Sequence, residues 1–226
     1  MKKLILTTLR MGAVMIGAVN ATTLADNIDV SAGVSVTNFT TDRGLATRED
    51  SFGYSLTLGA PLSDGTLSFG VDLNDLDGDF EQDFAVAYGR EISVFGQTLG
   101  AALSFAGTDS SLGDREEIAA GVTYSTPFAD VSTTVWHETE NDWFGVEIGL
   151  SRDIATPVDN LALTPFVTLN LADEYTAIEA GLKAGYKISD QLSLSAKLSY
   201  NDNNFDGSSF SVEDEWIAGA GLNFKF

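Results

Sequence analysis

The sequence contains no cysteine. This absence excludes disulfide bonds, thiolate metal sites and cysteine nucleophiles. It does not identify the compartment, although a chain exported into an oxidising space has nothing to mispair if it carries no thiol. The sequence also lacks a Gly-rich phosphate loop, a metal-binding triad and a redox motif. We therefore expect neither a cofactor nor a bound metal.

Basic residues are scarce, with 12 Lys and Arg against 33 Asp and Glu and a formal net charge of −21. Binding to nucleic acid requires a basic footprint, so we exclude nucleic acid as a partner. An acidic surface instead favours cations close to it.

After the N-terminal segment, no stretch is apolar enough to form a transmembrane helix. The N-terminal segment has positive charge, then a short apolar core at residues 11–19, then small residues at Ala21 and Ala25. This order is typical of a secretory signal peptide. We predict a cleaved signal peptide at residues 1–25, with cleavage after Ala21 as the alternative, and a single mature domain at residues 26–226.

Most of the mature chain alternates apolar and polar residues with a period of two. In the last segment, the apolar set is Trp216, Ala218, Ala220, Leu222, Phe224 and Phe226. Such alternation predicts strands with two different faces, and helical spacing fits none of the segments comparably well. Similar alternation occurs in residues 28–37, 52–60, 67–74, 99–105, 118–124, 161–169, 178–188 and 192–200.

The connections between these segments alternate in length. The short ones lie at residues 63–65, 95–97, 126–128, 155–160 and 189–191, and carry turn formers or small polar residues. The longer, mostly acidic ones lie at residues 40–51, 74–83, 107–116, 138–142, 172–175 and 201–212. This pattern predicts about twelve strands, or about ten if one weak hairpin is absent. Both termini then lie at the short-turn end.

A membrane protein without transmembrane helices has to be a closed barrel, because hydrocarbon offers no partner for bare backbone groups. We therefore predict an all-β fold, a transmembrane antiparallel up-and-down β-barrel with its apolar face toward lipid. Two aromatic belts support it. One comprises Phe52, Tyr54, Phe105, Phe144, Tyr200 and Trp216, and the other Tyr88, Tyr124, Tyr186, Phe224 and Phe226. The alternative is a soluble β-sandwich with these aromatics in its core.

The end of the chain, with Leu222, Phe224 and Phe226 at alternate positions, resembles that of bacterial outer-membrane β-barrels of the porin type. The resemblance implies a place in the bacterial outer membrane and contact with its lipids. It also implies that these three residues are the signal read by the barrel assembly machinery. More narrowly, residues 38–44 resemble the early Arg-Gly segment of the TorF-like putative porins, a family whose solutes are not well defined.

The polar face of the strands gives the predicted pore lining. The residues are Asp72, Glu91, Glu117, Asp130, Glu147, Glu179, Lys183, Lys187, Lys197 and Lys225. The lysines fall on the last three strands and the acidic residues mostly on others, which predicts an electric field across the pore. The alternative is that these groups pair and fill a narrow interior.

Other charged residues are assigned to the membrane surface. Arg90 and Arg152 fall on the lipid-facing parity beside predicted turns, where a long cation reaches the interface. The acidic segment at residues 75–83 has the wrong glycine position for a calcium loop and lacks the terminal bidentate Glu. We expect a solvated loop there, with divalent ions bridging it to lipopolysaccharide.

We predict a passive outer-membrane channel for small polar solutes and ions that favours cations, and not an enzyme. One alternative is a structural or surface-interaction barrel with a blocked lumen. Another is an outer-membrane hydrolase that uses His137, the only histidine. No serine motif is spaced to meet His137, and a nucleophile needs a base that a third group orients. Nothing in the sequence marks an oligomer face.

Overall fold

The computed structural model describes residues 28–42, 45–76, 79–110, 115–204 and 214–226. The predicted signal peptide lies outside these residues. The strands are β1 (Asp29–Asp42), β2 (Leu45–Pro61), β3 (Thr66–Leu76), β4 (Asp79–Val94), β5 (Gln97–Ser110), β6 (Arg115–Ser125), β7 (Asp130–Glu138), β8 (Trp143–Ser151), β9 (Ile154–Ala155), β10 (Leu161–Ala172), β11 (Thr176–Lys187), β12 (Leu192–Asn203) and β13 (Asp214–Lys225). No helix in the described ranges could cross a bilayer.

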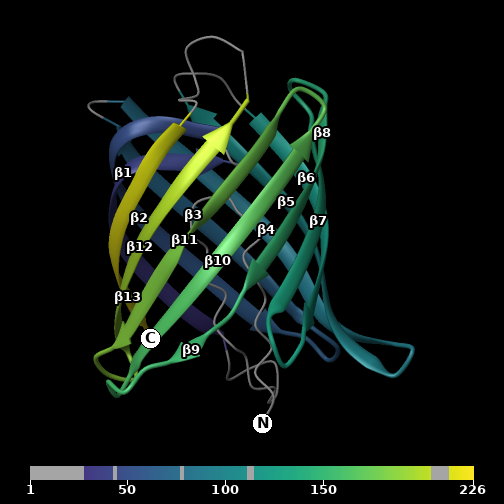
Figure 1. Ribbon diagram of the computed structural model, residues 1–226, viewed down its shortest axis with the longest axis vertical. Helices are drawn as coiled ribbons and strands as arrows, with labels where there is room; N and C mark the ends of the chain where they lie inside the picture. The colour runs from purple at the N-terminus through teal and green to yellow at the C-terminus, as the bar shows by residue number, and fades with distance from the viewer. Residues whose placement is uncertain (1–27, 43–44, 77–78, 111–114, 205–213) are drawn as a thin grey trace.

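The sheet closes on itself. Neighbouring strands pair antiparallel in chain order, and β1 pairs with β13 from Ser31 opposite Lys225 to Thr37 opposite Gly219. The two-residue β9 pairs only with one end of β10, so β8 and β10 are neighbours in the barrel wall. Figure 1 shows the tilted strands wrapped around one axis. The predicted up-and-down barrel of twelve strands is confirmed, with β9 as a short addition.

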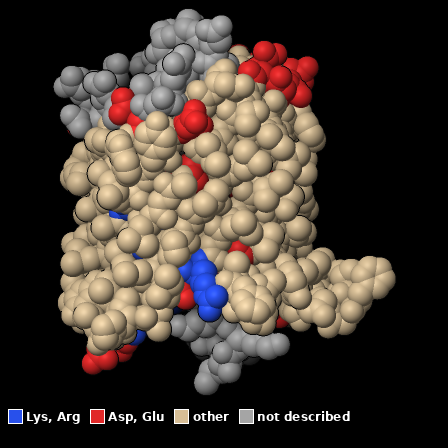
Figure 2. Space-filling view, viewed as in Figure 1, with Lys and Arg blue, Asp and Glu red and all other residues tan. Residues whose placement is uncertain are grey.

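The side chains are distributed inside out relative to a soluble protein. Large apolar side chains are exposed on the outer face, among them Leu56, Leu103, Ile118, Leu182, Leu198 and Trp216. Polar side chains are buried on the inner face, among them Asp72, Asp83, Glu117, Asn170, Glu179 and Asn201. Figure 2 shows a side wall mostly without charged side chains, which gather near its two ends. Such a surface suits hydrocarbon, and the β-sandwich alternative is wrong.

The aromatic residues of the loop-end belt lie on the outer face. Tyr200 and Trp216 pack with ring centroids 5.4 Å apart, and Phe52 and Tyr54 with centroids 4.9 Å apart. At the turn end, the Tyr88 hydroxyl donates to an Asp64 carboxylate oxygen at 2.9 Å. Rings with one apolar side and one polar atom suit the two membrane surfaces.

Several predicted loops are strand for most of their length. β1 continues to Asp42 and β2 begins at Leu45, whereas we predicted a loop at residues 40–51. β3 likewise reaches Leu76 and β4 begins at Asp79, within the loop predicted at residues 74–83. We predicted strands from the alternation of apolar residues, and this alternation is required only where one face of the strand contacts lipid. The backbone ladder continues beyond the lipid, because it requires only N–H and C=O groups.

Candidate pore interior

The register of the ladders places all ten predicted pore-lining residues on the inward-facing parity, because directly paired residues share a face. They differ in exposure. Asp72, Glu117 and Glu179 are buried, and Asp130, Glu147, Lys183 and Lys197 are partly buried. Glu91, Lys187 and Lys225 are exposed and lie near the short-turn end.

The inner face of β3–β8 is strongly acidic. Asp72 on β3 lies directly opposite Asp83 on β4. Asp83 accepts hydrogen bonds from the Thr108 hydroxyl at 2.7 Å and from the Asn74 amide at 3.2 Å. Among the described residues, Arg115 is the one basic residue on this part of the inner face.

Sequence reasoning missed two of these inward carboxylates. Glu81 and Asp83 are buried on the inner face, whereas we placed them in a solvated acidic loop. The period-two pattern could have identified both residues, because Glu81 and Asp83 have the same parity on β4 as Glu91, which was predicted to face inward. Asp75 lies on the opposite parity from Glu81 and Asp83, so these three carboxylates do not share one face. Within the described residues, no group of acidic or histidine side chains is arranged to hold a metal.

The basic side of the interior is built around Phe166 of β10, which sequence reasoning also missed. The Lys183 ammonium lies 4.7 Å from the Phe166 ring centroid and the Lys197 ammonium 5.6 Å from it. Lys197 also forms an ion pair with Glu179, which accepts a hydrogen bond from the Ser199 hydroxyl at 2.7 Å. We call Phe166, Glu179, Lys183, Lys197 and Ser199 the Phe166 cluster.

The other two predicted pore-lining lysines are held near the short-turn end. The Lys187 ammonium lies 2.6 Å from an Asp190 carboxylate oxygen, and this hydrogen bond and charge lower the pKa of Asp190. Lys225 pairs with Asp29 at 3.1 Å. Lys187, Lys197 and Lys225 thus each have a carboxylate on their own side, and the charges are less separated than the sequence predicts.

The two arginines on the outer face, Arg90 and Arg152, each contact a polar group. The Arg90 guanidinium lies 2.9 Å from an Asp64 carboxylate oxygen. The Arg152 guanidinium donates to the backbone carbonyl of Phe128 at 3.0 Å. Both contacts are at the short-turn end, where we predicted these residues to lie, and the interfacial role remains a prediction.

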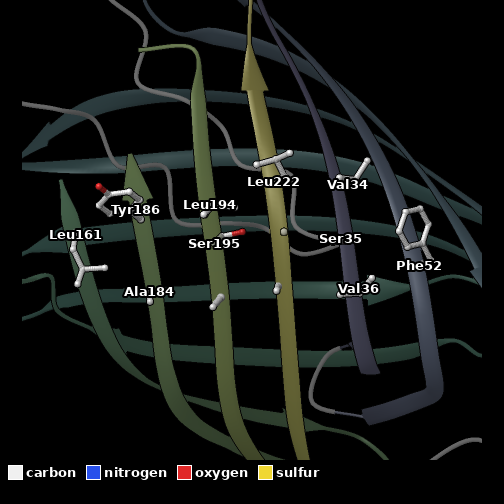
Figure 3. A pocket seen from close by; sticks show the side chains of 13 residues that line it. Val34, Ser35, Val36, Phe52, Leu161, Ala184, Tyr186, Leu194, Ser195 and Leu222 are labelled. Carbon is white, nitrogen blue, oxygen red and sulfur yellow. The ribbon is translucent and has the colours of Figure 1, made fainter. Parts of the chain in front are cut away.

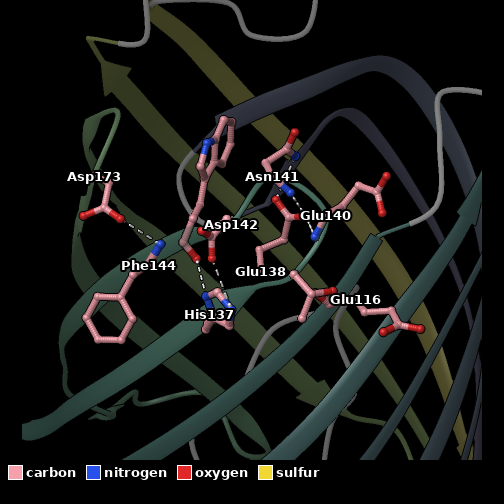
Figure 4. A network of polar contacts seen from close by, with 10 residues as sticks. Glu116, His137, Glu138, Glu140, Asn141, Asp142, Phe144 and Asp173 are labelled. Carbon is pink, nitrogen blue, oxygen red and sulfur yellow. Dashed lines mark hydrogen bonds and ion pairs between the residues drawn. The ribbon is translucent and has the colours of Figure 1, made fainter.

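The polar contacts in Figure 4 belong to the loop end of β7 and β8. Buried Glu138 accepts hydrogen bonds from the backbone N–H groups of Glu140 and Asn141 and from the Asn141 amide, at 3.0, 3.2 and 2.9 Å. These bonds fix the hairpin between the two strands. Asp173 accepts from the Phe144 N–H at 3.1 Å and links β8 to the next hairpin.

His137 lies in the same network. Its Nδ1 is 3.2 Å from the Trp143 carbonyl oxygen, and its Nε2 is 3.7 Å from an Asp142 carboxylate oxygen. The described partners of the imidazole are a backbone carbonyl and a carboxylate, and neither of these contacts places a serine hydroxyl beside the ring.

An aromatic group packs inside the barrel near the loop end. Trp136 is only 2% exposed and lies with Tyr175, Ala119 and Ala177, while the Trp143 and Tyr175 rings have centroids 6.0 Å apart. Trp136 lies directly opposite Gly145 on β8. A Cβ on Gly145 would collide with the indole ring. The glycine therefore makes room for the ring.

We expect Gly145→Ala to destabilise the barrel by about 1–3 kcal/mol, because a buried indole has little freedom to move away. Urea unfolding of the protein in phospholipid vesicles measures the change. Gly185→Ala is the matched control, since a Cβ on this inward-facing glycine meets nothing within 4 Å. Equal stability losses in the two variants would contradict the packing described here.

A shallow apolar groove lies on the outer face, across β10–β13, β1 and β2 (Figure 3). Its floor is a row of small residues in register, Ala184 opposite Ala196 and Ala196 opposite Ala220. Tyr186 and Leu194 stand at its rim. Because these residues have the lipid-facing parity, the groove belongs to the membrane surface and not to the pore.

No family model matches the chain, and no curated protein does. Solved structures do match. The chain is similar to the KdgM porin with a TM-score of 0.57 at 8% identity, covering 88% of this chain and 99% of that one. It is similar to the NanC porin with a TM-score of 0.54 at 12% identity, covering 88% and 100%. It is also similar to an outer membrane channel from Pseudomonas putida F1, with a TM-score of 0.52 at 12% identity, covering 88% of this chain and 94% of that one. At these identities the likeness establishes the fold, that of outer-membrane porin barrels.

Proposed function

We propose that the protein is a channel of the bacterial outer membrane, through which small polar solutes and ions diffuse passively. The observation that carries this proposal is the closed barrel with apolar side chains outward and charged side chains inward. The similar structures are named as porins and as an outer membrane channel. That likeness in fold supports the proposal without defining a solute.

We further propose that the channel favours cations. Inward carboxylates on β3–β8 include Asp72, Glu81, Asp83, Glu117 and Glu147, and Arg115 is the described basic residue among them. On the other side, Lys197 is matched by Glu179. A net negative potential along the path raises the local concentration of cations and lowers that of anions.

The ends of the chain belong to the same proposal. Leu222 and Phe224 of β13 have the lipid-facing parity, and the Phe226 N–H donates to the Val30 carbonyl at 2.9 Å, at the junction with β1. We propose that Leu222, Phe224 and Phe226 are the assembly signal and that residues 1–25 direct export. We also propose that lipids and lipopolysaccharide surround the barrel. The resemblance to TorF-like putative porins rests on residues 38–44 and remains a prediction.

A barrel with a blocked lumen is the second candidate. Inward side chains such as Trp136, Asn170, Glu179 and Asn201 are almost fully buried, which favours a filled interior at their level. Such a protein would act through its acidic outer loops. Conductance separates this candidate from the channel.

Reconstitution in planar bilayers tests both. We expect stable current steps and, in a salt gradient, a reversal potential displaced toward the cation Nernst potential. Replacing Lys183 and Lys187 by Glu should increase that displacement, because both residues have inward parity. Arg152→Glu, which changes charge on the outer face, is the control and should leave it unchanged. Absence of current at every voltage would support the blocked barrel, and an unchanged reversal potential would count against the lysine assignment.

A further inference from the structure

The hairpin between β4 and β5 extends beyond the barrel wall. β3 pairs with β4 only as far as Gly89, and β6 pairs with β5 only from Gly100. Between these points, Ile92 pairs with Leu99, Ser93 with Thr98, and Val94 with Gln97. Residues 92–99, which we call the β4–β5 ribbon, therefore pair only with each other.

The ribbon is uncharged and has two different faces. Ile92, Val94, Gln97 and Leu99 have the lipid-facing parity of their strands, whereas Ser93 and Thr98 have the inward parity. The apolar face is thus continuous with the lipid-facing wall of the barrel. The Gln97 side chain accepts a hydrogen bond from the Tyr124 hydroxyl at 3.0 Å. Just before the ribbon, outward-facing Tyr88 and Arg90 both contact Asp64, as side chains at a membrane surface do.

The tip of the ribbon carries a phenylalanine whose side chain is not covered by other described residues. Phe95 is fully exposed, and Val94 is exposed as well. Phe95 and Gly96 have φ values of +51° and +77°, the signs of a two-residue type I′ turn. Positive φ suits Asn or Gly and is unfavourable for a bulky residue. The turn therefore holds an aromatic ring outward at a position where a small polar residue is usual.

The direction of the ribbon decides what can meet this ring. In Figure 1 one hairpin at the short-turn end projects sideways from the wall, no lower than the other turns. In Figure 2 the same projection carries no charged side chain. The pairings above identify it as β4–β5. A ribbon that ran straight on would enter water, whereas one that runs sideways stays at the level of the membrane surface.

We propose that the β4–β5 ribbon is an in-plane membrane anchor, with its apolar face and Phe95 inserted at the lipid–water boundary of the leaflet at the short-turn end. An isolated two-stranded ribbon is marginally stable in water, and an apolar boundary supplies the contact its outward face lacks. Continuity with the lipid-facing wall favours lipid as the occupant over a second copy or a water-borne partner. The anchor increases the contact between the barrel and lipid and fixes the depth of the barrel in the bilayer. This role does not depend on whether the lumen conducts.

Spin labelling tests this directly, because the chain has no cysteine of its own. Phe95→Cys carries a nitroxide label in protein reconstituted into phospholipid vesicles, and collision rates with oxygen and with a water-soluble nickel chelate are measured. Leu103→Cys, on the lipid-facing wall, is the lipid reference. Ser63→Cys, in the β2–β3 turn at the same end, is the water reference. A difference in migration between unheated and heated protein in SDS gels shows that each variant is folded.

We expect the oxygen-to-nickel collision ratio at position 95 to be several-fold above that at position 63 and between that value and the ratio at position 103. A ratio equal to that at position 63 places the tip in water and overturns the proposal. Low collision rates with both reagents mean that protein covers the tip, and they also overturn it. In that case spin–spin broadening between labels distinguishes a second copy from another partner.

Discussion

Leu56→Arg is expected to destabilise the barrel by about 2–4 kcal/mol. Leu56 is 44% exposed on the outer face, midway along the apolar part of β2 and paired with Ala32 and Val71. In a water-soluble protein, a leucine this exposed could be replaced by arginine at little cost. In hydrocarbon the guanidinium loses its hydration and, from the middle of the bilayer, reaches neither surface easily.

Ile188→Arg is the control at the membrane surface. Ile188 is exposed just after β11, at the short-turn end, where an arginine can reach the lipid headgroups. We expect a cost of about 0–1 kcal/mol there. Urea unfolding in phospholipid vesicles, followed by fluorescence of the three tryptophans, measures both variants. If the two substitutions cost the same, the outer face does not meet lipid as described.

Glu179→Gln is expected to have a comparable or larger effect, about 3–5 kcal/mol, because it breaks a buried ion pair by removing one partner. Glu179 is 2% exposed and the Lys197 side chain 21% exposed. Without the carboxylate, the Lys197 ammonium would lie over Phe166 and next to Lys183 with less negative charge to balance it. The Ser199 hydroxyl would also lose a charged acceptor.

The double variant Glu179→Gln, Lys197→Met shows whether the loss comes from the stranded charge. Replacing both partners removes the unpaired ion, and we expect most of the stability to return. The same vesicle unfolding assay applies to the two single variants and the double variant. A double variant as unstable as Glu179→Gln alone would mean that the cost comes from packing or from the Ser199 hydrogen bond.

The fold could be predicted from the sequence because lipid and interior impose opposite demands on alternate residues. In β13, the outward residues Trp216 and Leu222 alternate with Gly219 and Gly221, and a shift by one position would put the wrong set into lipid. The short turns could also be predicted, since each contains a glycine, a proline or small polar residues. The twelve strands follow from these two signals together.

The pore interior was predicted less completely, because inward positions have no single chemical requirement. Phe166 and Trp136 face inward although they are apolar, and packing against Lys183 or Gly145 makes each position favourable. Each partner lies on a neighbouring strand, so the pattern of a single strand could not reveal it. Glu81 and Asp83 were missed for a different reason: the strands extend past the lipid, where alternation fades while backbone pairing persists.

The junction between β1 and β13 has a consequence for synthesis and folding. Ser31 and Lys225 meet across it, so the ladder that completes the cylinder joins opposite ends of the polypeptide. Contacts so distant in sequence form late and slowly. A nascent or truncated chain has two edge strands with unpaired backbone N–H and C=O groups. Burying such groups in hydrocarbon is unfavourable, and the edges can pair with other chains. The cylinder therefore cannot close until the residues of β13 are available to pair with β1.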